Sequence, residues 1–306
     1  MTRTAPRPRV VIVDGVPMSA LVAEAPQPRA VVLALHGGGT TAAYFDCPGH
    51  PELSLLRLGA SLGFTVVALD RPGYGSSAPY PEAMTLPEQR VRLAYAALDR
   101  IVGQWPDDAG LFVIAHSNGC ELALRMAADE RGANLLGIEM AGTGRHYHPA
   151  ARDVLNTATS TYRPPGLGEL LWHPAQLYPT DVLGGITKAA TGAPYEAAMV
   201  TTWPRHDFPA LAAQVRVPVQ FSVAEHEKVW QSDPAALAEI ATMFSAAPRF
   251  IINEQRRAGH NLSLGHTAAA YHLKVLSFAE ECVVGQDNPA VEEAATQKTE
   301  ADLEAG

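Results

Sequence analysis

The chain has 306 residues, of which 47% are hydrophobic and only 18% charged, so it can bury one large core and is too apolar to be a disordered protein. Its formal net charge of −9 argues against binding to the phosphate backbones of nucleic acids and to anionic membranes, because both attract basic surfaces. The three widely spaced cysteines, Cys47, Cys120 and Cys282, exclude a disulfide framework and favour a cytoplasmic setting. We expect no signal peptide, because Met1–Arg9 holds no apolar run of the required length, and no membrane span, because no run approaches 18 apolar residues.

Short apolar runs recur along the chain and predict strands. The first two flank Asp14-Gly15, a dipeptide typical of hairpin turns. Most of the others are continuous rather than alternating, which is typical of strands that are buried on both faces of a parallel sheet. In chain order, the predicted strands are Val10–Val13, Met18–Ala23, Ala30–Leu35, Phe64–Leu69, Leu111–Ala115, Leu135–Met140, Val217–Val223 and Phe250–Ile252.

Helical patterns lie between these strands. Apolar residues recur at helical spacing from Val91 to Val102. The stretch Ser117–Ala128 is rich in alanine and leucine, and Gly132 stands just beyond it as a stop signal. A last amphipathic pattern runs from Leu264 to Phe278. Because buried strands alternate with helices, we expect an α/β fold with a parallel sheet that is covered on both faces.

The stretch Thr143–Gln214 interrupts this alternation. It carries eight prolines, together with Trp172 and Trp203. It is too long for a simple loop and too aromatic for a linker. We interpret it as an inserted cap of short helices over the carboxyl edge of the sheet, with Trp172 and Trp203 in contact with substrate. An irregular surface excursion without a role is the alternative.

The remaining segments complete the predicted domain organisation. Residues 284–306 carry six acidic residues and one lysine. Such a composition cannot bury enough apolar surface to fold, so we expect a disordered acidic tail. Residues 1–142 and 215–283 then form the core domain, and residues 143–214 form the cap.

Ser117 stands between the predicted strand Leu111–Ala115 and a predicted helix. A nucleophile elbow needs this order, because the tight turn exposes the serine hydroxyl at the edge of the sheet. The small residues Ala115 and Gly119 stand two positions before and after the serine, which gives the pattern A-x-S-x-G. A serine that only caps the helix would also explain this motif taken alone.

Two further motifs follow neighbouring strands. His36-Gly37-Gly38-Gly39 comes directly after Ala30–Leu35, and its glycines would let backbone N–H groups reach a developing oxyanion. A flexible loop at the strand exit is the alternative. Asp70–Ser77, with the sequence DRPGYGSS, follows Phe64–Leu69, and its glycines predict a tight turn with a structural role.

Together, the motifs HGGG, DRPGYGSS and HSNG resemble those of the α/β-hydrolase family in order and distance, over roughly Val10 to Glu280. The resemblance implies an α/β-hydrolase fold: an eight-stranded, mostly parallel sheet that is flanked by helices and carries an inserted cap. It also implies a triad in the chain order Ser, acid, His.

By this resemblance, Ser117 is the nucleophile, Glu227 the acid and His260 the general base. Glu227 stands where the family usually has aspartate, three residues after a small residue. Glu225 and Glu139 are the other candidate acids. The backbone N–H groups of Asn118 and Gly38 would form the oxyanion hole, with Gly39 as the alternative to Gly38.

The reaction that follows is acyl transfer through an acyl-enzyme. We expect a serine hydrolase that cleaves a small-molecule ester or thioester. No three metal ligands stand at a recognisable spacing, and this chemistry needs neither a metal nor an organic cofactor. Two alternatives stay open, namely an acyl-transferring or cyclising thioesterase of a biosynthetic pathway and a non-hydrolytic binding module on the same fold.

Overall fold

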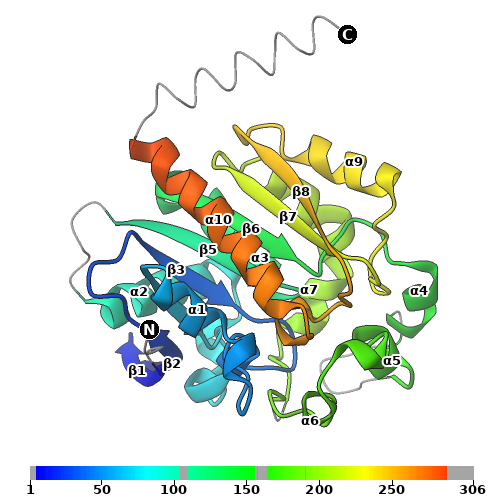
Figure 1. Ribbon diagram of the computed structural model, residues 1–306, viewed down its shortest axis with the longest axis horizontal. Helices are drawn as coiled ribbons and strands as arrows, with labels where there is room; N and C mark the ends of the chain where they lie inside the picture. Colours follow the sequence, from blue (N-terminus) through cyan, green and yellow to red (C-terminus); the bar gives the residue numbers. More distant parts are fainter. Residues whose placement is uncertain (1–4, 104–108, 156, 158–163, 190, 288–306) are drawn as a thin grey trace, which may run out of the picture.

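An eight-stranded sheet runs through the middle of the molecule, with helices on both of its faces (Figure 1). The computed structural model describes residues 5–103, 109–155, 157, 164–189 and 191–287. All eight predicted strands are present, and their ends differ from the predicted ones by only a few residues. They are β1 Arg7–Val13, β2 Val16–Ala23, β3 Ala30–Leu35, β4 Phe64–Leu69, β5 Gly110–His116, β6 Leu135–Ala141, β7 Val219–Ala224 and β8 Phe250–Gln255.

The strand order is β1-β2-β4-β3-β5-β6-β7-β8. Strand β2 pairs antiparallel with β1 and with β4, and all other neighbours are parallel. Asp14 and Gly15 have φ angles of 49° and 82°, the left-handed conformation that a two-residue hairpin turn of type I′ requires. The hairpin and the mostly parallel sheet predicted from the sequence are therefore confirmed.

Apolar layers join the two faces of the sheet to their helices. One face carries α2 Pro87–Val102, α3 Gly119–Ala128, α8 Phe208–Ala212 and α9 Pro234–Met243, and the other carries α1 Leu55–Ser61 and α10 Ala268–Asp287. Strand β3 shows why the central strands are continuous apolar runs. Val31 and Leu33 enter the first layer, whereas Val32 and Ala34 enter the second. Helices α1 and α9 are elements that the sequence patterns did not predict.

The last helix, α10, is longer than expected. It continues to Asp287, so the first four residues of the segment predicted to be a disordered tail are helical. Val283, just before these residues, packs against the core and is 8% exposed, whereas Val284 is 42% exposed. The rest of the predicted tail, residues 288–306, lies outside the described residues.

Between β6 and β7 the described chain consists mainly of short helices. They are α4 Pro149–Leu155, α5 Leu167–Leu171, α6 Thr180–Leu183 and α7 Glu196–Thr202, followed by a π-helical turn, Trp203–Asp207, and by α8. Helix α8, however, belongs to the core, because Phe208 and Ala212 are fully buried in the apolar layer that also holds α3. A crossover between parallel strands packs a helix against the sheet. The last part of the segment predicted to be the cap, from Phe208 to Ala212, therefore packs with the core domain.

One acidic side chain lies inside the sheet. Glu139 of β6 has no exposed surface, and Tyr271 Oη of α10 donates a hydrogen bond to its Oε1 at 3.0 Å. Burial raises the pKa of Glu139 to about 8, against the opposing effect of hydrogen bonds from neighbours such as Tyr271. Glu139 is therefore a largely protonated, structural acid at neutral pH.

We expect Glu139 to make the free energy of unfolding depend on pH. The carboxyl holds its proton up to about pH 8 in the folded chain, but releases it near 4.5 in the unfolded chain. Its stabilising contribution is thus complete below the lower value and is lost as the pH rises toward the higher one. The variant Glu139→Gln is neutral throughout and should lose less stability between about pH 5.5 and about pH 8 in urea titrations. An equal loss in both proteins would contradict this account.

Candidate active site

Ser117 occupies a sharp turn between β5 and α3. Its φ is 52°, a left-handed value that residues other than glycine adopt rarely. Its N–H donates to Ala141 O at the end of β6, at 2.8 Å, and α3 begins only two residues later. The turn holds the serine at the carboxyl edge of the sheet, and backbone strain of this kind concentrates at functional sites.

The turn brings α3 unusually close to β3. A Cβ atom on Gly119 would lie 2.4 Å from Leu35 O and 2.7 Å from His36 O, which are both backbone atoms at the end of β3. Because neither atom can move without shifting the strand, glycine is required at position 119. The pattern A-x-S-x-G thus reflects a close approach of two backbones.

Glu227 and His260 form a buried pair. The Nδ1 atom of His260 lies 3.1 Å from Oε1 and 3.0 Å from Oε2 of Glu227. The two side chains are only 1% and 4% exposed, with His260 the more buried. A carboxylate at Nδ1 favours the proton on that nitrogen, which leaves Nε2 as the proton acceptor. The pair can therefore take up a proton at Nε2.

The environment of Glu227 keeps it ionised. Burial acts to raise its pKa, but His260 and the backbone N–H groups of Val229 and Trp230 outweigh burial and lower the pKa below its usual value. The N–H groups of Lys228 and Val229 donate to Oε1 at 3.0 and 2.8 Å. A hydrogen bond from Glu227 N to Ala224 O, at 3.1 Å, closes the turn that carries the side chain.

The other two candidate acids lie elsewhere. Glu225 is exposed, and its Oε2 accepts the N–H of Arg257 at 2.6 Å. Glu139 is buried within β6 and bonded to Tyr271. Among these three described carboxylates, only Glu227 forms a hydrogen bond with His260.

Contacts from β5 and from the cap hold the backbone around His260. The Nε2 atom of His116 donates to His260 O at 2.9 Å. Tyr178 Oη accepts the N–H of Asn261 at 3.2 Å, and Asn261 Nδ2 donates to Leu171 O at 2.9 Å. The cap residues Leu171 and Tyr178 therefore position the loop that carries the histidine, a role that the sequence patterns do not indicate.

The loop His36–Gly39, called the glycine loop below, lies beside Ser117. Gly38, Gly39 and Asn118 line the same cavity as Ser117 and His260. The N–H of Gly39 donates to Tyr74 Oη at 2.9 Å. Within the described ranges, the N–H groups of Gly38 and Asn118 form no hydrogen bond with the protein. Of the two glycines considered as oxyanion donors, the geometry therefore favours Gly38.

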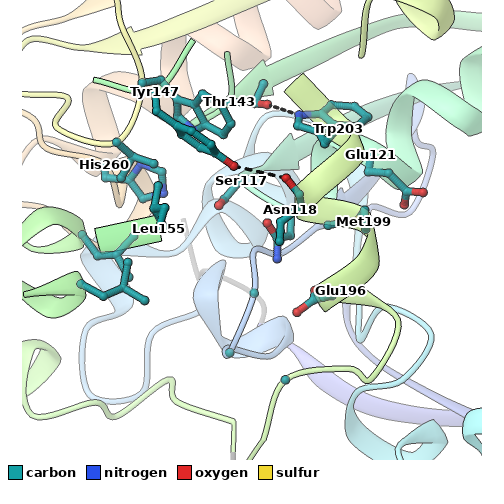
Figure 2. Close-up of a pocket in the computed structure, with 18 of the residues that line it drawn as sticks. Ser117, Asn118, Glu121, Thr143, Tyr147, Leu155, Glu196, Met199, Trp203 and His260 are labelled. Atoms are coloured by element: carbon teal, nitrogen blue, oxygen red, sulfur yellow. Dashed lines mark hydrogen bonds between the residues drawn. The ribbon is translucent and has the colours of Figure 1, made fainter. Parts of the chain in front are cut away.

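The cavity at Ser117 has a volume of about 200 Å³ (Figure 2). Its wall is mainly apolar, and residues of the cap supply most of it. The large apolar side chains of the wall are Tyr147, Leu155, Leu167, Leu171, Met199, Val200, Trp203, Val229 and Trp230. Such a wall suits a hydrocarbon portion of a substrate next to the serine.

The two tryptophans expected to contact substrate are placed differently. Trp203 lines the cavity, and its Nε1 donates to Thr143 Oγ1 at 3.0 Å. Trp172 does not line the cavity, because its ring packs edge-on against Tyr178, 5.1 Å away, next to the other apolar layer. Trp172 therefore does not form part of the wall of this cavity, and its contact with substrate stays a prediction.

Two wall residues escaped the sequence analysis. Tyr147 and Trp230 stack with ring centroids 4.5 Å apart, and both line the cavity. The available signal was the place of Trp230, only three residues after Glu227. Tyr147 gave no comparable signal, because it lies next to Trp230 only in the folded chain.

Some classes of site are absent from the described part of the chain. No three His, Cys, Asp or Glu side chains gather there as a metal ion would require. None of the described helices is long and apolar enough to cross a bilayer. No disulfide joins the three cysteines, which are all described and buried.

Comparisons with known proteins agree with the fold. Residues 31–272 match the sequence model of the alpha/beta hydrolase family. No curated protein sequence matches significantly. Solved structures of three proteins are similar over most of both chains. The thioesterase domain from the curacin biosynthetic pathway is 18% identical, with 89% of this chain and 100% of that chain covered and a TM-score of 0.60. A lipase in its open form is 17% identical, with 91% and 99% of the two chains covered and a TM-score of 0.64, and a mutant N-acyl homoserine lactonase complexed with N-hexanoyl homoserine is 15% identical, with 91% and 98% covered and a TM-score of 0.65. At identities this low, the likeness shows the fold alone.

We expect Gly119→Ala to destabilise the protein. The added Cβ would overlap backbone atoms of β3, and overpacking of this kind costs about 1–3 kcal/mol or more. Gly168→Ala is the matched control, because a Cβ there meets nothing within 4 Å and the site lies in helix α5. Thermal unfolding followed by circular dichroism should show a lower melting temperature for Gly119→Ala only. Equal melting temperatures would show that the two backbones can separate freely.

Proposed function

The chain belongs to the alpha/beta hydrolase family, and from this premise we propose that it is a serine hydrolase that cleaves a small-molecule ester or thioester. The observation that carries the proposal is the buried contact of 3.0 Å between Glu227 and His260, beside the cavity that exposes Ser117. A binding module has no use for a buried, hydrogen-bonded carboxylate–imidazole pair next to a strained serine. We therefore prefer an enzyme to a non-hydrolytic binder.

In the proposed mechanism, His260 Nε2 removes the proton of the Ser117 hydroxyl as its oxygen attacks the acyl carbon. The same proton then passes to the departing alcohol or thiol. Glu227 holds the proton on Nδ1 and stabilises the imidazolium that forms. Water attacks the acyl-enzyme carbonyl with His260 again as base, and the proton then passes from Nε2 to Ser117 Oγ as the acyl–oxygen bond breaks and the acid product leaves.

The developing oxyanion is the second requirement of this mechanism. We assign its stabilisation to the backbone N–H groups of Gly38 and Asn118, which line the cavity and form no other described hydrogen bond. Each donor of this kind contributes on the order of 3 kcal/mol to the transition state. The scheme needs no cofactor.

The cavity wall supports an apolar acyl or alcohol group in the substrate. Acyl transfer to an alcohol or amine, or cyclisation, shares every step up to the acyl-enzyme and differs only in the acceptor that replaces water. We propose hydrolysis as the primary reaction.

We also keep the cytoplasm as the proposed location, because no disulfide joins the three described cysteines.

We expect Ser117→Ala to abolish turnover. A fluorophosphonate probe should label the wild-type chain at Ser117 and leave the variant unlabelled. Turnover should fall by about 10⁴-fold or more, the scale of triad knockouts. The measurement uses p-nitrophenyl esters and acyl thioesters of graded chain length, with product analysis to separate hydrolysis from acyl transfer. Undiminished turnover in the variant would refute the assignment of the nucleophile.

We expect Glu227→Gln to preserve the fold and to reduce turnover by about 10⁴-fold, because an amide at Nδ1 no longer stabilises the imidazolium or secures its tautomer. Glu225→Gln is the matched control, since the same exchange two residues away alters only an exposed turn. Steady-state kinetics on the best ester should separate the two variants clearly. If Glu225→Gln lost activity and Glu227→Gln kept it, the acid would be Glu225.

A further inference from the structure

Arg71, in the turn after β4, is a fully buried cation with 0% exposure. Its Nη2 donates to Gly37 O at 3.0 Å and to Glu196 Oε1 at 2.6 Å. Taking a guanidinium out of water costs several kcal/mol unless its partners compensate. A turn that only reverses the chain does not need such a group, so the contact with the glycine loop requires an explanation.

The contact with Gly37 O bears directly on the neighbouring N–H. The carbonyl of Gly37 and the N–H of Gly38 belong to one planar trans peptide, so they point in opposite directions. His36 Nδ1 donates to the same carbonyl at 2.8 Å, and His36 Nε2 accepts the backbone N–H of Arg71 at 3.0 Å. Holding the oxygen end of this peptide therefore aims its N–H end.

The charge of Arg71 also affects the strength of that N–H. A hydrogen bond from a guanidinium is charge-assisted and draws electron density toward the carbonyl oxygen. Polarisation of the peptide makes its N–H a stronger donor, as in chains of cooperative hydrogen bonds. Arg71 can thus raise the electrostatic stabilisation of an oxyanion without touching the substrate.

Glu196, the first residue of cap helix α7, holds this arrangement from the other side. Its Oε1 accepts from Arg71, and its Oε2 accepts from Tyr74 Oη at 2.7 Å. Tyr74 Oη in turn accepts the N–H of Gly39 at 2.9 Å. The cap carboxylate therefore fixes both groups that bind the peptides flanking Gly38.

Gly38 itself lies between these groups and the elbow. A Cβ on Gly38 would lie 2.7 Å from Asn118 Nδ2 and 3.3 Å from Glu196 Oε2. Figure 2 shows Asn118 and Glu196 at the same cavity, with Ser117 beside Asn118. The peptide that Arg71 holds is thus in the immediate surroundings of the nucleophile.

We propose that Arg71 is a positioning residue of the oxyanion hole: it aims and polarises the N–H of Gly38 by binding Gly37 O, and Glu196 of the cap keeps Arg71 in place. The inference rests on the proposed serine hydrolase function. It makes the cap a part of the oxyanion hole as well as a wall of the cavity.

The test compares catalysis with the binding of an oxyanion mimic. The double variant Arg71→Met with Glu196→Gln removes both charges together, so neither is left buried and unpaired. With p-nitrophenyl butyrate, kcat should fall about 100-fold, the scale of one lost oxyanion donor, while KM stays within about threefold. A trifluoromethyl ketone, which adds to the serine as an oxyanion, should lose affinity by a similar factor of about 100.

Two further variants support the test. Arg71→Lys keeps the cation without the planar fork and should lose about tenfold in kcat and in ketone affinity, and it replaces the double variant if that chain does not fold. Glu239→Gln is the control, because it weakens a different contact between the start of the cap and the core. Glu239 of helix α9 lies 3.6 Å from Arg145 Nε and 2.8 Å from His146 Nε2. It should leave kcat and ketone affinity unchanged.

The outcomes separate this inference from the proposed function. If the wild-type chain reacts with a fluorophosphonate and the Arg71 variants bind the ketone as tightly as the wild type, the inference is overturned and the proposed function stands. A fall in kcat without loss of ketone affinity also overturns it. If the wild-type chain does not react with the fluorophosphonate, the proposed function fails and this inference fails with it.

Discussion

The close approach of helix α3 to the end of strand β3 is the contact on which the site depends. Without a side chain, Gly119 lets the first turn of α3 lie against the carbonyls of Leu35 and His36. Because β3 and β5 are parallel neighbours, their carboxyl ends meet at one edge of the sheet. The glycine loop after β3 and Ser117 after β5 therefore face one cavity.

The cap does more than cover this edge. Leu171 and Tyr178 bind the loop of His260, and Glu196 binds the two residues that hold the glycine loop. The segment that forms most of the cavity wall thus also supports the groups beside the cavity that we propose to act in the reaction.

Two buried glutamates show how partners determine charge. Burial alone would raise the pKa of both Glu139 and Glu227. Glu227 faces the His260 ring and several backbone N–H groups, and these lower its pKa. Glu139 has only neutral partners such as Tyr271, so burial prevails and the carboxyl stays largely protonated at neutral pH. A glutamate is therefore an anion at position 227, beside the cavity, and a neutral acid at position 139, within the sheet.

The sequence by itself determined the features that depend on neighbours along the chain. Apolar runs located all eight strands, and the runs of central strands such as β3 and β4 are continuous because strands covered on both faces bury every side chain. Asp14-Gly15 located the hairpin turn through its left-handed conformation. The order of motifs selected Ser117, Glu227 and His260, of which the first and last share a cavity and the last two share a hydrogen bond.

Only the tertiary structure decided features that depend on residues distant in the chain. Trp172 and Trp203 are alike as residues of the cap, but one packs beside Tyr178 and the other lines the cavity. Helix α8 belongs to the core because of its contacts with the layer of α3. The sequence places Arg71 only in a turn, whereas the folded chain brings it into hydrogen-bond contact with Glu196, 125 positions away. Periodicity reports which face of an element is apolar, whereas these outcomes depend on which distant surface that face meets.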